Sequence, residues 1–118
     1  MVSGRLHSYA MVAGEIDQMV TRMIHESYGV EKYYDSHVGS STYLLRVLKN
    51  RVPQENEPNL AFVTHTDKSF TTILHQNQVN GLEVETKDGN WITVHFSPSS
   101  FVVMAGDALM VAHFYHLI

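Results

Sequence analysis

Residues 82–94, LEVETKDGNWITV, decide what kind of fold this chain can adopt. Apolar and acidic residues alternate over residues 82–85, which places the apolar side chains on one face of an extended strand. Asp88-Gly89 is a favoured two-residue hairpin turn, and residues 91–94 return with aromatic and β-branched side chains. The stretch therefore predicts a β-hairpin.

Further strand patterns lie on both sides of this hairpin. Towards the N-terminus they cover residues 42–48, 60–65 and 70–75, and towards the C-terminus residues 101–105. A polar loop with two prolines separates the first two of these segments. Several short strands divided by turns favour a sandwich, a jelly roll or a barrel-like sheet.

The first third of the chain has a helical pattern instead. Ile16, Met19, Val20, Met23 and Ile24 recur at helical spacing, and the next glycine, at position 29, can end the helix. Such a stripe most simply packs against a core. Residues 31–37 favour a short second helix, so we expect an α+β protein with its helices first.

The composition excludes several classes of function. The 118 residues, 44% hydrophobic and 17% charged, fit a single globular domain. A net charge of −4 without a basic cluster argues against nucleic-acid and membrane-surface partners. No cysteine is available for disulfides or thiolate metal sites. The absence of an apolar signal core or a membrane-length apolar run predicts a cytoplasmic location.

His65-Thr66-Asp67 is the clearest chemical motif. At the end of a strand, residues two apart lie on the same face, so an imidazole and a carboxylate would point the same way. These are two of the three ligands of the 2-His-1-carboxylate site of non-haem Fe(II) oxygenases. The triplet is weak evidence when taken alone, and the competing interpretation is a surface His65 beside a turn-capping Asp67.

The remaining polar candidates have simpler interpretations. We expect His25, on the first helix, and His37, in a loop, to be solvated. His75 and His95 lie in strand-like segments and are expected on a solvent face. Asp107 follows a glycine and is expected to be a turn residue that bonds nearby backbone N–H groups.

The β-rich half resembles the plant 2-oxoglutarate- and Fe(II)-dependent dioxygenases, which have the isopenicillin N synthase-like fold. The resemblance rests on several motifs that occur in the family's order and spacing. It is closest to the branch that contains the glucosinolate-side-chain oxygenases. The matching segments are HTD (65–67), TTILHQ (71–76), GLEV (81–84), DGNWITV (88–94) and PSSFVVMAGD (98–107).

The resemblance implies a double-stranded β-helix, or jelly roll, here incomplete, with iron inside its mouth. By that implication His65 and Asp67 are iron ligands, 2-oxoglutarate is the cosubstrate, and ascorbate is a candidate accessory. The substrate would be a small plant metabolite. The implied division is a helical segment at 1–40, a partial jelly roll at 41–110 and an atypical tail at 111–118.

Three features depart from the family pattern. The family's distal histidine would fall about four residues beyond Ile118. The Arg-x-Ser motif that binds 2-oxoglutarate would follow it and is also absent. Asn50 stands where the family often has a tyrosine. His113 and His116, in the apolar tail, are the candidates for a third ligand within this chain.

Two other functions compete with the dioxygenase. A truncated, non-catalytic relative would act, if at all, by self-association or partner binding through the sheet edges that an incomplete jelly roll leaves open. A jelly-roll binding domain of the cupin type would need a His-x-His motif, and the sequence has none.

Overall fold

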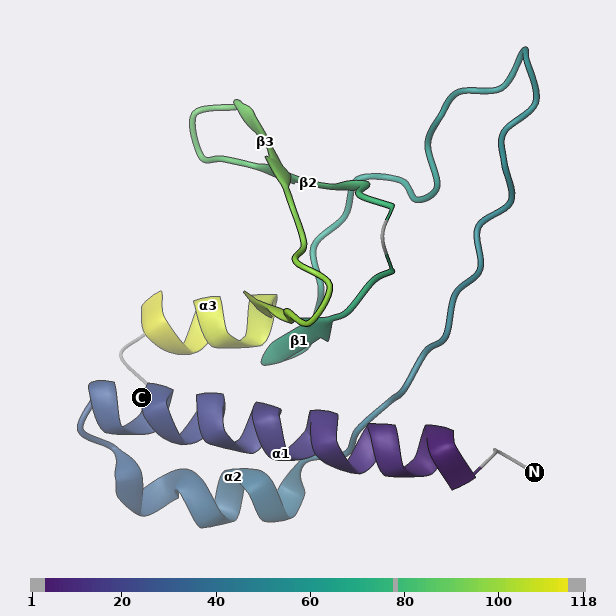
Figure 1. Cartoon of the computed structure of the whole chain (residues 1–118). Coiled ribbons are helices and arrows are strands. Elements are labelled where there is room, and N and C mark those ends of the chain that lie inside the picture. Colours follow the sequence, from purple (N-terminus) through teal and green to yellow (C-terminus); the bar gives the residue numbers. More distant parts are fainter. Residues whose placement is uncertain (1–3, 78, 115–118) are drawn as a thin grey trace.

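The computed structural model describes residues 4–77 and 79–114 (Figure 1). Helices come first and last, and four short strands lie between them. In chain order the elements are α1 (Gly4–Ser27), the 3-10 helix η1 (Glu31–Tyr33), α2 (Tyr34–Ser40), β1 (Thr71–Leu74), β2 (Leu82–Glu85), β3 (Trp91–Val94), β4 (Val102–Ala105) and α3 (Asp107–Phe114).

Helix α1 confirms the predicted helix and extends it back to Gly4. It ends at the predicted glycine, because Gly29 has a φ of +69°, which favours a residue without a Cβ atom. The N–H of Gly29 donates to the carbonyl of Glu26, and that of Val30 to the carbonyl of His25. These bonds satisfy carbonyl groups that the helix end leaves without a partner. The second helix also forms, as η1 followed by α2.

The strands form two antiparallel pairs. In one pair β2 and β3 form the predicted hairpin, with Leu82 opposite Val94. The Asp88-Gly89 turn is confirmed, since the N–H of Thr86 donates to the carbonyl of Asn90 at 2.8 Å across it. In the other pair β1 lies beside β4, although 27 residues separate Leu74 from Val102 in the sequence. The predicted strands at 70–75 and 101–105 are thus confirmed, each slightly shorter than expected.

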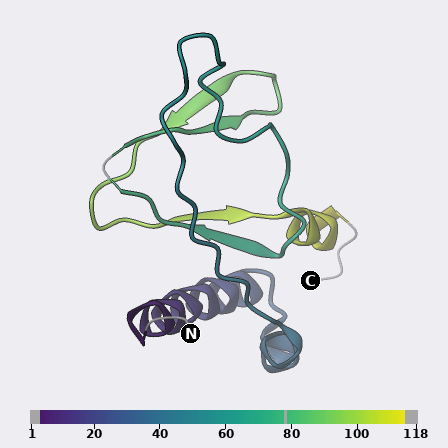
Figure 2. The ribbon, with the colours of Figure 1, turned by 90° about the vertical axis from the view of Figure 1, so that its right-hand side faces the viewer.

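Two other predicted strands are wrong. Residues 42–48 and 60–65 have no regular secondary structure and belong to the long connection between α2 and β1 (Figure 2). Their sequences suit a strand, but a strand also needs a neighbour that accepts and donates its ladder hydrogen bonds. In the described residues no strand pairs with either segment. Val47 and Val63 are consequently 70% exposed.

Helix α1 lies between α2 on one side and β1 on the other, and the β2–β3 hairpin is further away (Figures 1 and 2). The arrangement is open for its size. Its radius of gyration is 16.5 Å, whereas a compact chain of this length would have about 13.5 Å. Its accessible surface is 9930 Å², against about 6,500 Å² for a compact monomer of this mass.

No hydrophobic side chain in residues 4–77 and 79–113 is buried, so this part of the chain has no closed core. None of the helices in these residues is long and apolar enough to cross a membrane. The expectation of an α+β protein with helices before the sheets is confirmed in that coarse form. The final helix was not expected, because residues from 108 onwards show no clear apolar period in the sequence.

Candidate functional site

The structure brings His65 and Asp67 together at the end of the long connection, just before β1. His65 Nε2 lies 3.4 Å from Asp67 Oδ1, although the segment is not a strand. The side chains are 50% and 32% exposed, so the pair is accessible. Two ligands about 2.1 Å from a first-row divalent metal, and at right angles to one another, lie about 3 Å apart. The observed spacing therefore fits two adjacent ligands of one metal ion.

A hydrogen bond fixes which nitrogen of His65 is available. Nδ1 lies 2.8 Å from the carbonyl oxygen of Val63, and a carbonyl can only accept, so Nδ1 carries a hydrogen. In the neutral imidazole, Nε2 then presents its lone pair towards the Asp67 carboxylate. Two acceptors that face each other at 3.4 Å repel unless a proton or a metal cation lies between them. This donor set suits a divalent cation, and a backbone carbonyl that orients a histidine ligand is typical of metal sites.

The start of α3 lies against the same segment. The N–H of Asp107 donates to the carbonyl of Asp67 at 2.7 Å, and the Thr66 hydroxyl donates to Asp107 Oδ2 at 3.0 Å. Asp107 is the first residue of α3, and its carboxylate accepts the hydrogen bond from the Thr66 side chain. Our expectation of a turn residue that bonds nearby N–H groups was wrong, because the sequence did not show that α3 begins there.

Gly106 makes this approach possible. A Cβ atom at this position would lie 2.0 Å from the carbonyl oxygen of Ser69 and 2.9 Å from that of Asp67. Sequence reasoning missed the roles of Thr66, Gly106 and Asp107, since the segments that meet are about 40 residues apart. The available signal was the Gly-Asp pair at the end of a strand, which marks a close approach of two backbones.

The described residues provide no third metal ligand. They contain no group of three or more His, Asp or Glu side chains that could hold an ion. His113 lies in α3, where its Nδ1 is 2.7 Å from the Tyr28 hydroxyl. His116 lies outside the described residues. His113 therefore does not join His65 and Asp67 in this structure, and His116 as a third ligand stays a prediction.

A second polar cluster lies where α1, α2 and β1 meet. His25 is only 2% exposed, and its Nδ1 lies 2.8 Å from the carbonyl oxygen of Thr21. The expectation of a solvated His25 was wrong, because α2 and the residue preceding β1 cover it: its ring centroid is 5.2 Å from that of His37 and 6.1 Å from that of Phe70. His37 is half-buried in α2 rather than in a loop, and its ring lies 4.4 Å from Phe70.

Burial, followed by the nearby His25, holds the pKa of His37 below its ordinary value, and Asp17 opposes this effect. A hollow of about 190 Å³ opens beside this cluster, lined in part by Asp17, Tyr43 and Thr71. The Thr71 hydroxyl donates to the Asp17 carboxylate and so connects α1 to β1. The cluster holds secondary-structure elements together and does not include His65 or Asp67.

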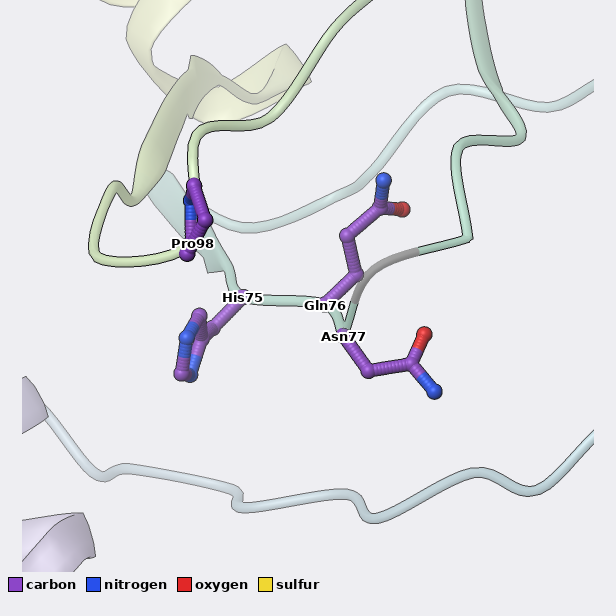
Figure 3. Close-up of a pocket in the computed structure, with 4 residues that line it drawn as sticks. All are labelled: His75, Gln76, Asn77 and Pro98. Atoms are coloured by element: carbon purple, nitrogen blue, oxygen red, sulfur yellow. The ribbon is translucent and has the colours of Figure 1, made fainter.

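Another hollow, of about 430 Å³, is lined by His75, Gln76, Asn77 and Pro98 (Figure 3). It lies at the end of β1 opposite to His65 and Asp67, because those residues precede the strand and His75 follows it. His75 is exposed, as expected, and its Nδ1 lies 2.9 Å from the Tyr9 hydroxyl. His95 is exposed as well.

Comparisons with a family model and with individual proteins point to the same family. The family model of the 2OG-Fe(II) oxygenase superfamily matches residues 26–115. The chain is 47% identical over 112 residues to the Arabidopsis thaliana protein named probable 2-oxoglutarate-dependent dioxygenase AOP1, which covers 92% of this chain and 37% of the relative.

Shorter matches come from the same plant. The 2-oxoglutarate-dependent dioxygenase AOP3 is 51% identical over 53 residues, covering 45% of this chain and 13% of the relative. A protein named probable inactive 2-oxoglutarate-dependent dioxygenase AOP2 has the same identity and coverage. The chain thus spans little more than a third of the length of the relatives that it matches best among these. The expected resemblance to plant 2-oxoglutarate-dependent dioxygenases is confirmed.

Proposed function

The chain belongs to the 2OG-Fe(II) oxygenase superfamily, and from this premise we propose that it forms part of a 2-oxoglutarate-dependent dioxygenase in which His65 and Asp67 bind the iron. The observation that carries the proposal is the geometry of this pair. His65 Nε2 and Asp67 Oδ1 are 3.4 Å apart, and in the neutral imidazole the bond from Nδ1 to the Val63 carbonyl leaves Nε2 as the acceptor. The family name implies the two cofactors, Fe(II) and 2-oxoglutarate.

Each residue of the pair has a separate task. The His65 imidazole offers a neutral lone pair, and the Asp67 carboxylate offers a negative charge that offsets part of the charge of a divalent ion. When bound, iron(II) and 2-oxoglutarate would supply the electrons that activate dioxygen, the oxidant of a dioxygenase. The partial exposure of both side chains leaves room for a cosubstrate and a small-molecule substrate. Ascorbate stays a candidate accessory.

The fold completes the proposal. We assign residues 41–110 to part of a jelly roll, residues 1–40 to helices that precede it, and residues 111–118 to an atypical tail. Two antiparallel strand pairs and two extended segments without strand partners support this assignment. The relative AOP1 is nearly three times longer than the matched region, so a whole protein of this kind has further chain to cover the exposed faces. The third ligand and the Arg-x-Ser motif would then lie outside this chain.

The substrate in this proposal is a small plant metabolite, and the protein is cytoplasmic. The sequence resemblance to the glucosinolate-side-chain branch favours that class among plant substrates. Neither a nucleic acid nor a membrane is expected as a partner, in keeping with the net charge of −4.

The large exposed surface supports a second candidate function, association with another chain. The accessible surface exceeds that of a compact monomer by about 3,400 Å². Part of the excess comes from apolar side chains of the long connection, such as Leu44, which is 76% exposed, and Val52, which is 86% exposed. Exposed apolar surface of this extent favours association, so a non-catalytic chain that pairs with itself or with a partner is the alternative. One relative is itself named as probably inactive.

Anaerobic titration with Fe(II) and 2-oxoglutarate tests the first proposal. The measurement is the visible charge-transfer band of the iron chelate, with circular dichroism to verify folding. We expect a band in the wild type and in the control His95→Ala, which removes an exposed histidine elsewhere, and no band in His65→Ala. A folded wild type without a band, which elutes as an oligomer in size-exclusion chromatography, would favour the non-catalytic alternative.

A further inference from the structure

We propose that Thr66 and Asp107 form a clamp that positions His65 and Asp67 as a ligand pair. This inference rests on the proposed function and adds two positioning residues to it. Thr66 Oγ1 and Asp107 Oδ2 bond to each other at 3.0 Å, and Asp107 does not form a three-ligand group with His65 and Asp67 among the described residues, so the role of the two residues is to position the pair.

The clamp acts on the one residue that separates the two ligands. Thr66 is anchored through its side chain to Asp107 Oδ2, and the adjacent carbonyl of Asp67 is anchored by the N–H of Asp107 at 2.7 Å. Asp107 therefore holds two consecutive residues of the motif, one through its carboxylate and one through its backbone. Within the segment, His65 Nδ1 bonds to the Val63 carbonyl. Two of these three bonds thus attach the motif to Asp107, and the third orients the imidazole.

The need for such a clamp follows from the missing strand. A ligand pair at the end of a paired strand is held by the ladder hydrogen bonds of its neighbours. Residues 60–65 have no strand partner among the described residues, and the segment is exposed. Without the bonds from Asp107 and Thr66, the bond between His65 Nδ1 and the Val63 carbonyl would be the one hydrogen bond left on this pair among the described residues, and a metal ion would have to order the loop when it binds.

Helix α3 provides a rigid base for the clamp. Two more backbone bonds join the start of this helix to the residues just before β1, from the N–H of Gly106 to the carbonyl of Phe70 at 3.0 Å and from the N–H of Ala108 to that of Ser69 at 3.2 Å. The Asp107 carboxylate thus projects from a helix whose start is hydrogen-bonded to residues 67–70, the stretch that joins the metal-binding motif to β1. A rigid supporting residue of this kind preserves ligand geometry better than a loop residue would.

Two measurements on the 118-residue chain test the inference. The first is Co(II) binding, measured by calorimetry and by the visible Co(II) spectrum, with Co(II) used as an air-stable substitute for Fe(II). The second is amide hydrogen exchange of residues 64–68 in the metal-free chain. The variants are Thr66→Val, which keeps the shape but removes the hydroxyl, and Thr66→Ser, which restores it. Ser69→Ala is the matched control, since it removes another exposed hydroxyl bond in this region, that between Ser69 and Thr72.

We expect Thr66→Val to weaken Co(II) binding about tenfold, to alter the Co(II) spectrum and to accelerate exchange in residues 64–68. Thr66→Ser and Ser69→Ala should behave like the wild type. Asp107→Asn keeps one acceptor oxygen for the Thr66 hydroxyl, so its Co(II) affinity and exchange rate should fall between those of the wild type and Thr66→Val. If Thr66→Val does not fold, Asp107→Asn provides a second test. Wild-type affinity and wild-type exchange in Thr66→Val would overturn the clamp.

The two proposals fail in different ways. If the wild type binds no Co(II), the metal assignment of His65 and Asp67 fails in this chain. The exchange measurement then still decides the clamp, because it needs no metal: faster exchange in Thr66→Val supports it, and unchanged exchange overturns it.

Discussion

Replacing Gly106 by alanine places a methyl group where the structure has no room for one. The new Cβ atom would lie 2.0 Å from the carbonyl oxygen of Ser69 and 2.7 Å from its carbonyl carbon. Both are backbone atoms, so no side-chain rotation relieves the overlap. To bring the new methyl group to about 3.0 Å, the shortest separation that proteins tolerate, the segment that contains Gly106 must move away by about 1 Å from residues 67–70.

The size of the effect follows from the bonds at this junction. Residues 106–108 donate three backbone hydrogen bonds to carbonyls of residues 67–70, at 2.7 to 3.2 Å. A shift of about 1 Å breaks or weakens all three, at about 0.5–1.5 kcal/mol each. The smaller entropy of the unfolded alanine chain offsets about 0.4–1 kcal/mol. We expect a net loss of about 2–3 kcal/mol, or a melting temperature lower by roughly 6–12 °C.

Gly39→Ala is the matched control, because it makes the same chemical change in α2 with no atom within 4 Å of the new Cβ. Helix propensity should make it neutral or stabilising by up to about 1 kcal/mol. The assays are urea unfolding followed by circular dichroism, and amide exchange of residues 64–70. If Gly106→Ala is as stable as Gly39→Ala and exchange at residues 64–70 is unchanged, the close approach of α3 to the metal-binding segment is wrong.

Three further predictions concern other parts of the chain. Lowering the pH from about 7.5 to about 5.5 should destabilise the wild type more than His37→Gln. Burial and the neighbouring His25 hold the pKa of His37 below its ordinary value of 6.5 in the folded protein. The unfolded chain therefore binds a proton at His37 at a higher pH than the folded chain does, and the stability that is present above pH 6.5 is lost as the pH falls below it. Equal losses of melting temperature in both proteins would refute this. Gly29→Ala should lower the free energy of unfolding by about 1 kcal/mol, because the φ of +69° at this position disfavours a Cβ atom, and Gly29→Asn should lower it less. Urea unfolding compares the two variants, and equal stability would count against the helix end described above. Arg51→Ala should leave the melting temperature unchanged despite the 2.6 and 2.7 Å bonds to Glu57, because both side chains are exposed and solvent screens the ion pair; a clear loss in thermal melting would show that the pair matters.

The prediction of strands from sequence succeeded where a strand had a partner within the chain. The hairpin of β2 and β3 needs only local information, since the alternation and the Asp88-Gly89 turn lie within 13 residues of sequence. Residues 42–48 and 60–65 have equally good strand patterns, but no neighbouring strand pairs with them among the described residues. Strand propensity describes how a segment fits a sheet and does not supply the sheet.

The sequence by itself determined the first two helical segments, the β2–β3 hairpin, the His65-Thr66-Asp67 motif and the family to which its order of motifs points. Each of these depends on residues that are close together in the chain or on motifs in a fixed order. The tertiary structure alone decided that His25 is buried and that Asp107 begins a helix beside the motif. It also decided that Gly106 lies against a carbonyl of residue 69. Those facts depend on which distant segments meet, and contact between segments about 40 residues apart leaves no period or spacing in a single sequence.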